Sequence, residues 1–161
     1  MRERFAWAIV GLISTACLGE QFDPAADLRE GGFEVISSGG LLRRFLVHAP
    51  TSIQGPGDPP LVIAFHGAGQ TPEELRQLTA LDDLADRQRF VVAYPEAYRP
   101  TGGTWGVHAG SPVERVGVFD LLFVVDLIDF LAARFDIDRG RVYAVGYSSG
   151  GQVSHRVGCE L

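Results

Sequence analysis

The sequence is poor in the residues from which metal sites and nucleic-acid surfaces are built. It has two cysteines and four histidines in 161 residues. It contains no H-E-x-x-H motif and no C-x-x-C pair, so we expect no metal site. The formal net charge is −6 and the basic residues form no cluster, so nucleic acid is not an expected partner. The glycine fingerprint of dinucleotide-binding proteins and the P-loop are also missing, and no cofactor is expected.

A membrane-spanning run is missing too. The apolar stretch from Phe5 to Ile13 is shorter than the roughly 20 apolar residues needed to cross a bilayer. With two arginines before it and small residues after it, the stretch predicts an export signal over residues 1–19, followed by a polar linker over 20–31. Cys17 lies in a segment that resembles the lipobox of bacterial lipoproteins, with Ser14 where an aliphatic residue is usual. Lipid attachment at Cys17 and ordinary cleavage both remain open, and either predicts a protein secreted to the periplasm or the extracellular space.

The composition indicates one globular domain, which we place at residues 32–161. The chain is 46% hydrophobic and 21% charged, which argues against disorder. Its first two expected strands flank Gly39-Gly40, a hairpin signal. The second of these strands alternates apolar and basic residues through Arg43 and Arg44, which we interpret as an edge strand with one face in water.

Three short apolar runs, LVIAF, FVVAYP and RVYAVGY, predict strands that are covered on both faces. Each run is followed by a helical pattern, and Thr71 and Pro72 are suited to the cap and first position of the first helix. Residues 96–117 have no period and predict a long surface loop before the helix VFDLLFVVDLIDFLAARF. The alternation predicts an α/β fold, a parallel sheet with helices on both faces and antiparallel strands at its N-terminal end.

The pattern Gly146-Tyr147-Ser148-Ser149-Gly150 joins the last strand to the last helix. Such a turn lifts a serine hydroxyl clear of the sheet, where a base can remove its proton. Glycines on both sides let the backbone pass close to itself. We therefore predict that Ser148 is a catalytic nucleophile. The backbone N–H of Ser149 is predicted to donate to an oxyanion.

A second oxyanion donor is expected from the loop after an earlier strand. The strand LVIAF ends at His66-Gly67-Ala68-Gly69. We predict that the N–H of Ala68, held by the bends at Gly67 and Gly69, faces the same oxyanion as Ser149. His66 is expected to order this loop rather than to act as a base. The alternative is that the segment is only a turn that leaves a strand.

Four segments together resemble one family. They are PLVIAFHGAGQTPEEL, FVVAYPEAY, TW and LIDFLAARFDIDRGRVYAVGYSSGGQVSHRVGCE. They are similar to the polyhydroxybutyrate depolymerase and feruloyl or acetylxylan esterase group of secreted α/β-hydrolases. The resemblance covers about residues 40–161. It implies an α/β-hydrolase fold and a carboxylic ester hydrolase that acts without a cofactor on a polyester or on acyl groups of plant polysaccharide.

By the same resemblance, Ser148 matches the nucleophile of the family, and Ala68 and Ser149 match the positions whose amides form its oxyanion hole. Two features depart from the pattern. Phe119-Asp120 stands where two adjacent aspartates are frequent, and the cysteines that many relatives carry after the tryptophan are missing. Cys159 is therefore left without its usual kind of partner.

The acid and histidine of an α/β-hydrolase follow the serine in chain order. His155 lies seven positions after Ser148 on the expected helix, or about 10 Å along its axis, whereas a base needs a contact of about 3 Å. Glu160 is no better placed, and His48 and His108 lie upstream. We therefore expect the N-terminal part of a longer protein, cut after the nucleophile elbow, and a 161-residue polypeptide that is poorly soluble and nearly inactive.

Two other functions remain open. A serine peptidase of the same fold would use the same elbow. A secreted or lipid-anchored binding module would keep the fold without a complete triad.

Overall fold

The computed structural model describes residues 32–53 and 58–161 of the chain. The expected export signal over 1–19, Cys17 and the linker over 20–31 lie outside the described residues. The strands are β1 (Glu34–Ser38), β2 (Leu41–His48), β3 (Leu61–Phe65), β4 (Val91–Pro95) and β5 (Val142–Gly146). The α-helices are α1 (Pro72–Thr79), α2 (Leu81–Gln88), α3 (Pro112–Arg115), α4 (Asp120–Phe135) and α5 (Ser149–Glu160). Short 3-10 turns lie at Thr51–Ile53 and Arg99–Thr101.

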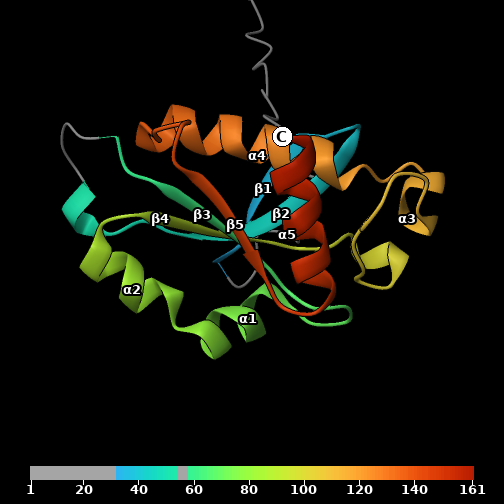
Figure 1. Cartoon of the computed structure of the whole chain (residues 1–161), viewed down its shortest axis with the longest axis horizontal. Helices are drawn as coiled ribbons and strands as arrows, with labels where there is room; N and C mark the ends of the chain where they lie inside the picture. Colours follow the sequence, from blue (N-terminus) through green and yellow to red (C-terminus); the bar gives the residue numbers. More distant parts are fainter. Residues whose placement is uncertain (1–31, 54–57) are drawn as a thin grey trace, which may run out of the picture.

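The strands form one mixed sheet in the order β1-β2-β4-β3-β5 (Figure 1). β3 pairs in parallel with both β4 and β5, whereas β2 pairs antiparallel with β1 and β4. The predicted hairpin is present, and its turn residues Gly39 and Gly40 both have positive φ, at 57° and 78°. Glycine adopts this backbone at little cost, which explains the pair at this turn.

The prediction that β2 is an edge strand is wrong. β2 lies between β1 and β4, and only 2% of Arg43 is exposed. Its guanidinium donates to the buried carboxylate of Asp120 at 2.7 Å, and Arg44 pairs with Glu96 at 2.7 Å. The basic residues of this strand therefore form ion pairs instead of facing water. The sequence did not indicate this because both partners come from distant parts of the chain.

Helices cover both faces of the sheet, as expected from the alternation of strands and helices. In Figure 1, α1 and α2 lie on one side of the sheet, and α4 and α5 lie on the other. Ile63 and Phe65 of β3 pack with Phe123 of α4 in one core cluster. Ala64, between them, packs with Leu75 of α1 in the second cluster. This alternation is the period of two that a strand buried on both faces requires.

The expected cap of α1 is present. The Thr71 hydroxyl accepts a hydrogen bond from the Glu74 N–H at 3.3 Å, and the Glu74 carboxylate accepts from the Thr71 N–H at 3.0 Å. Pro72 occupies the first turn. This reciprocal capping box fixes where the helix begins, directly after the loop that leaves β3.

The prediction that β5 is covered on both faces is wrong: among the described residues, β5 forms one edge of the sheet. Its side chains alternate: Val142 and Ala144 pack against the core on the α4 and α5 side. Tyr143 and Val145 face the other way and are 54% and 42% exposed. No helix within residues 32–53 and 58–161 is long and apolar enough to cross a membrane.

Candidate active site

Ser148 lies at the junction between β5 and α5, in the sharp turn that the sequence predicts. Its backbone has φ 53° and ψ −119°, a conformation that L-residues rarely adopt and that costs about 1–3 kcal/mol. Two hydrogen bonds close the turn, from the Gly150 N–H to the Tyr147 carbonyl at 2.8 Å and from the Gly151 N–H to the Ser148 carbonyl at 2.9 Å. Ser148 is exposed, so its hydroxyl is open to a substrate.

Gly146 and Gly150 are required by close backbone contacts. A Cβ on Gly146 would lie 2.3 Å from the carbonyl carbon and oxygen of Gly150. A Cβ on Gly150 would lie 2.1 Å from the Phe65 carbonyl oxygen and 2.6 Å from that of His66. The glycines therefore let the elbow close on itself and let it pack directly against the end of β3.

The loop His66–Gly69 lies beside this elbow. The Tyr147 N–H donates to the Phe65 carbonyl at 3.1 Å, which extends the β3–β5 pairing into both turns. Within the loop, the Gly67 N–H donates to the Gln70 side chain at 2.9 Å. The Gly69 N–H donates to the Gly103 carbonyl at 3.1 Å, with φ 72° at Gly69. Ala68, between these two fixed amides, is exposed.

Both ring nitrogens of His66 are used inside the protein. Nε2 accepts a hydrogen bond from the Ala97 N–H at 3.0 Å, so Nδ1 carries the proton that it donates to the Gly67 carbonyl at 2.7 Å. Burial of the ring lowers the pKa of His66, because the charged form loses its hydration. A neutral ring with both nitrogens occupied cannot accept a proton from Ser148, which supports the structural role expected for His66.

Trp105 is a part of this region that the sequence analysis did not single out as buried. The expected surface loop over 96–117 instead contains a 3-10 turn, α3 and this tryptophan, which is 2% exposed. Its indole N–H donates to the His66 carbonyl at 2.8 Å. Its ring contacts those of His66 and Phe65, with centroids 5.1 and 5.3 Å apart. The sequence signals for this contact were the large apolar ring of Trp105 within a loop and its place in the segment TW of the family resemblance.

The remaining histidines have contacts other than Ser148. His48, the last residue of β2, is in register with Val92 near the start of β4 and contacts Asp86 at 2.9 Å. His108 contacts the carbonyl of its neighbour Ala109 at 2.9 Å. His155 lies on the surface of α5, 3.8 Å from the sulfur of Cys159, which is a free thiol. Across the described ranges, no histidine hydrogen-bonds to Ser148, and no group of His, Cys, Asp and Glu could hold a metal ion.

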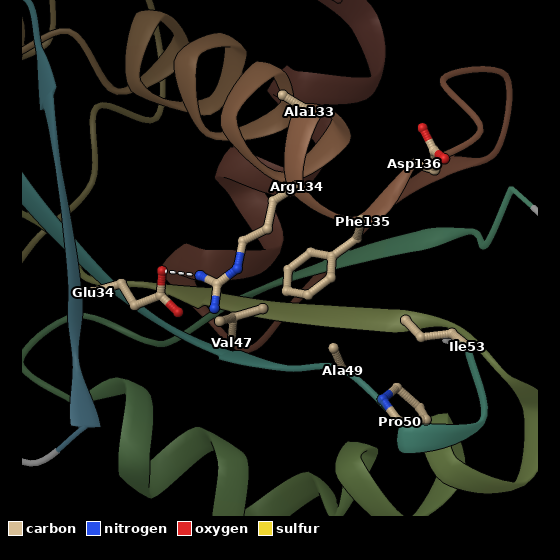
Figure 2. A pocket seen from close by; sticks show the side chains of 9 residues that line it. All are labelled: Glu34, Val47, Ala49, Pro50, Ile53, Ala133, Arg134, Phe135 and Asp136. Carbon is tan, nitrogen blue, oxygen red and sulfur yellow. Dashed lines mark hydrogen bonds and ion pairs between the residues drawn. The ribbon is translucent and has the colours of Figure 1, made fainter. Parts of the chain in front are cut away.

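The pocket in Figure 2 lies at the end of the sheet opposite to Ser148. It has a volume of 580 Å³ and is formed by the C-terminal end of α4, the end of β2 and the segment after it. Arg134 and Phe135 point into it from α4, and Arg134 pairs with Glu34 of β1. The parallel strands begin at this end, so the pocket is separate from the elbow.

A second hollow, of 460 Å³, lies in the loop after β4, at the same end of the sheet as Ser148. Its lining is mostly apolar and comes from Tyr98, Pro100, Thr101, Thr104, Pro112, Val113, Val116 and Val118. Thr104 is adjacent to Gly103, which binds the Gly69 amide. The hollow therefore borders the segment that supports the loop His66–Gly69.

The mixed sheet, its helices and the strand–serine–helix turn define the protein as an α/β-hydrolase. An acetyl xylan esterase structure from Aspergillus awamori superposes with a TM-score of 0.58 at 20% identity, over 74% of this chain and 44% of that one. Residues 52–158 match the family described as esterase PHB depolymerase. The chain belongs to this esterase family.

Two curated relatives agree with this assignment. Feruloyl esterase B of Neurospora crassa is 30% identical over 97 residues, which are 60% of this chain and 33% of the relative. A bifunctional acetylxylan esterase/xylanase of Neocallimastix patriciarum is 32% identical over 117 residues, 72% of this chain and 16% of the relative. The chain therefore spans about a third of the first relative's length and less of the second's.

Proposed function

We propose that this chain forms the nucleophile-bearing part of a serine carboxylic ester hydrolase that works through an acyl-enzyme on Ser148. The observation that supports this most strongly is the strained backbone of an exposed Ser148, between a strand and a helix and directly against the loop His66–Gly69. Asp136 has the same φ but a ψ of 45°, the left-handed conformation common at helix ends, whereas the ψ of −119° at Ser148 lies outside that region and costs stability.

The reaction has two steps. The Ser148 oxygen attacks the ester carbonyl carbon and loses its proton to a base, the carbonyl oxygen becomes an oxyanion, and the alcohol departs with a proton as the C–O bond breaks. Water then attacks the acyl carbon and releases the acid and free Ser148. The N–H groups of Ala68 and Ser149 stabilise the oxyanion, each worth about 10²- to 10³-fold in rate. His66, Gly67 and Gly69 hold the Ala68 amide in place.

The base and its orienting acid are proposed to come from sequence after Leu161. The histidines among the described residues have other partners. On this proposal the 161-residue chain alone turns over substrate very slowly or not at all.

The proposed substrates are a polyester or acyl groups attached to plant polysaccharide. This class follows from the family and from relatives named as feruloyl and acetylxylan esterases. We further propose export from the cytoplasm, either as a soluble protein or with a lipid on Cys17. Mass spectrometry of the exported N-terminus distinguishes a processed soluble chain from one that begins at a lipid-modified Cys17.

The test uses protein expressed from its complete coding sequence. We expect it to hydrolyse p-nitrophenyl acetate or butyrate, and Ser148→Ala to lower kcat by about 10⁴-fold or more. Ser37→Ala, an exposed serine on β1, is the matched control and should retain full activity. Cleavage of peptides in preference to esters would support the serine peptidase instead. Absence of turnover, with no difference between the parent and Ser148→Ala, would support the binding module.

A further inference from the structure

The backbone of Gly106 is held at both its N–H and its carbonyl by buried charged side chains. Its N–H donates to the carboxylate of Asp120 at 2.6 Å, and its carbonyl accepts from the guanidinium of Arg156 at 2.6 Å. Asp120 is fully buried and Arg156 is 8% exposed. Hydrogen bonds to charged groups are about twice as strong as neutral ones. The two peptide groups that flank the Cα of Gly106 are thus bound by opposite charges from α4 and α5.

The two charged groups are themselves fixed by ion pairs. The second oxygen of Asp120 accepts from Arg43 at 2.7 Å, and the Arg43 guanidinium lies 4.1 Å from the centroid of the Phe123 ring. Arg156 pairs with Glu114 at 2.7 Å and with Glu160 at 2.9 Å. Burying charges is costly and is often no better for stability than apolar packing. Stability alone therefore gives a weak reason for building this cluster around Gly106.

The residues next to Gly106 support the loop that carries Ala68. Trp105, its direct neighbour, donates its indole N–H to the His66 carbonyl at 2.8 Å. Gly103, three positions earlier, accepts from the Gly69 N–H at 3.1 Å. Segment 103–106 thus holds the loop His66–Gly69 at both of its ends. The bonds to the Gly106 N–H and carbonyl therefore fix the backbone next to both of these contacts.

We infer that Asp120 and Arg156 are positioning residues for the oxyanion loop, acting through the backbone of Gly106, Trp105 and Gly103 on the amide of Ala68. The inference rests on the proposed function for its catalytic meaning, but the mechanical connection exists independently of catalysis. Neither side chain touches the reacting atoms.

The primary variant is Asp120→Asn. An amide has one acceptor oxygen and one donor NH₂, so the substituted side chain cannot accept from both Arg43 and the Gly106 N–H as the carboxylate does. The matched control is Asp129→Asn, the same change on the same helix, in an ion pair with Arg139 that is 58% exposed on each side. The protein is expressed from its complete coding sequence, and hydrogen–deuterium exchange is measured by mass spectrometry on peptides covering 66–70 and 61–65.

We expect Asp120→Asn to speed exchange in peptide 66–70 about tenfold, with strand peptide 61–65 and the control variant unchanged. In ester hydrolysis, kcat should fall about 10- to 100-fold while KM stays within about threefold, because oxyanion alignment acts on the transition state. Unchanged exchange at 66–70, or an equal rise in both peptides, would overturn the inference.

Arg156→Met is the second variant, because it removes the bond to the Gly106 carbonyl and keeps apolar bulk. If Asp120→Asn does not accumulate as folded protein, the exchange of peptides 66–70 and 61–65 is compared in Arg156→Met instead. The exchange result is independent of turnover. If the unsubstituted protein hydrolyses no ester, the proposed function fails. The exchange experiment still decides whether the hydrogen bonds of Asp120 and Arg156 to Gly106 order the loop His66–Gly69.

Discussion

The glycines of the elbow and of α5 differ in what surrounds them. A Cβ on Gly150 would meet two backbone carbonyl oxygens of β3 and its loop at 2.1 and 2.6 Å, whereas a Cβ on Gly158, on the same helix, meets nothing within 4 Å. We predict that Gly150→Ala destabilises the protein by about 3 kcal/mol or more. Gly158→Ala should stabilise it by about 0.5–1 kcal/mol, because alanine is the better helix former.

Urea unfolding followed by circular dichroism measures both variants. Equal effects of the two substitutions would mean that the elbow does not pack against β3 as described. Gly146→Ala, with its contact at 2.3 Å, should behave like Gly150→Ala.

His66 gives the protein a pH-dependent stability. Burial lowers the pKa of the folded-state ring below its usual value of 6.5, so the unfolded chain takes up the proton first as the pH falls. The stability linked to His66 is therefore complete above about pH 7.5 and is lost as the pH drops through 6.5. Below pH 6.5, the free energy of unfolding is expected to fall by up to about 1.4 kcal/mol per pH unit.

Urea midpoints between pH 7.5 and 5.5 measure this slope. We expect His66→Gln to be less stable at pH 7.5 and to show a flatter pH dependence than the parent. His108→Gln, at an exposed loop position, should keep the slope of the parent. A parent protein whose midpoint does not change across this window would contradict the neutral, hydrogen-bonded ring.

Local patterns predicted the residues of the elbow but not those that support it. Ser148 and its glycines lie within five consecutive residues, so their geometry is encoded by neighbours along the chain. Arg43 and Asp120 are 77 positions apart, and nothing near Arg43 indicates that a buried carboxylate will meet it. The sequence therefore predicted that Arg43 faces water, whereas the structure buries it.

At the scale of secondary structure, α1 offers a test of local encoding. Its capping box satisfies N–H groups at both Thr71 and Glu74. We predict that Thr71→Ala lowers the free energy of unfolding by about 1 kcal/mol. Thr71→Ser retains the accepting hydroxyl and should lower the free energy of unfolding by only a few tenths of a kcal/mol. Thermal denaturation of both variants measures the difference, and equal losses would show that the hydroxyl does not cap the helix.

The strands β3, β4 and β5 and the helix α4 were predictable because each has a strong internal pattern. Continuous apolar runs of strand length indicate burial on both faces. The structure places all three runs in the parallel part of the sheet, but only β3 and β4 are buried on both faces, because β5 lies at the edge. The place of β2 was not predictable in this way. Its alternating pattern is equally compatible with an edge and with an interior strand, and only the distant partners Asp120 and Glu96 decide between them.

At the scale of the whole molecule, the described sheet ends on β5 with an apolar surface beside it. Tyr143 and Val145, together with Leu78 of α1, are exposed there. Unpaired strand edges with apolar neighbours favour association between chains. We predict that the 161-residue chain produced alone self-associates, and that Val145→Lys reduces this association.

Sedimentation velocity over a concentration series measures the effect. Val116→Lys is the control, because Val116 is 68% exposed but lies in the loop after α3. It should leave the association unchanged. A chain that remains monomeric at high concentration, or two lysine variants with the same effect, would show that the β5 surface is not the contact.

The strand order carries one more consequence for the molecule. The chain leaves β3 toward β4 through α1 and α2, then returns past β3 to β5 through α4 on the other face. The loops that leave the neighbouring strands β3 and β5 lead to α1 on one face and to α5 on the other (Figure 1), and such a topological switch point leaves a crevice between the outgoing loops. The place of the candidate site at this edge therefore follows from the order in which the chain forms the strands. Loop substitutions could redirect the protein to a new substrate without moving that crevice.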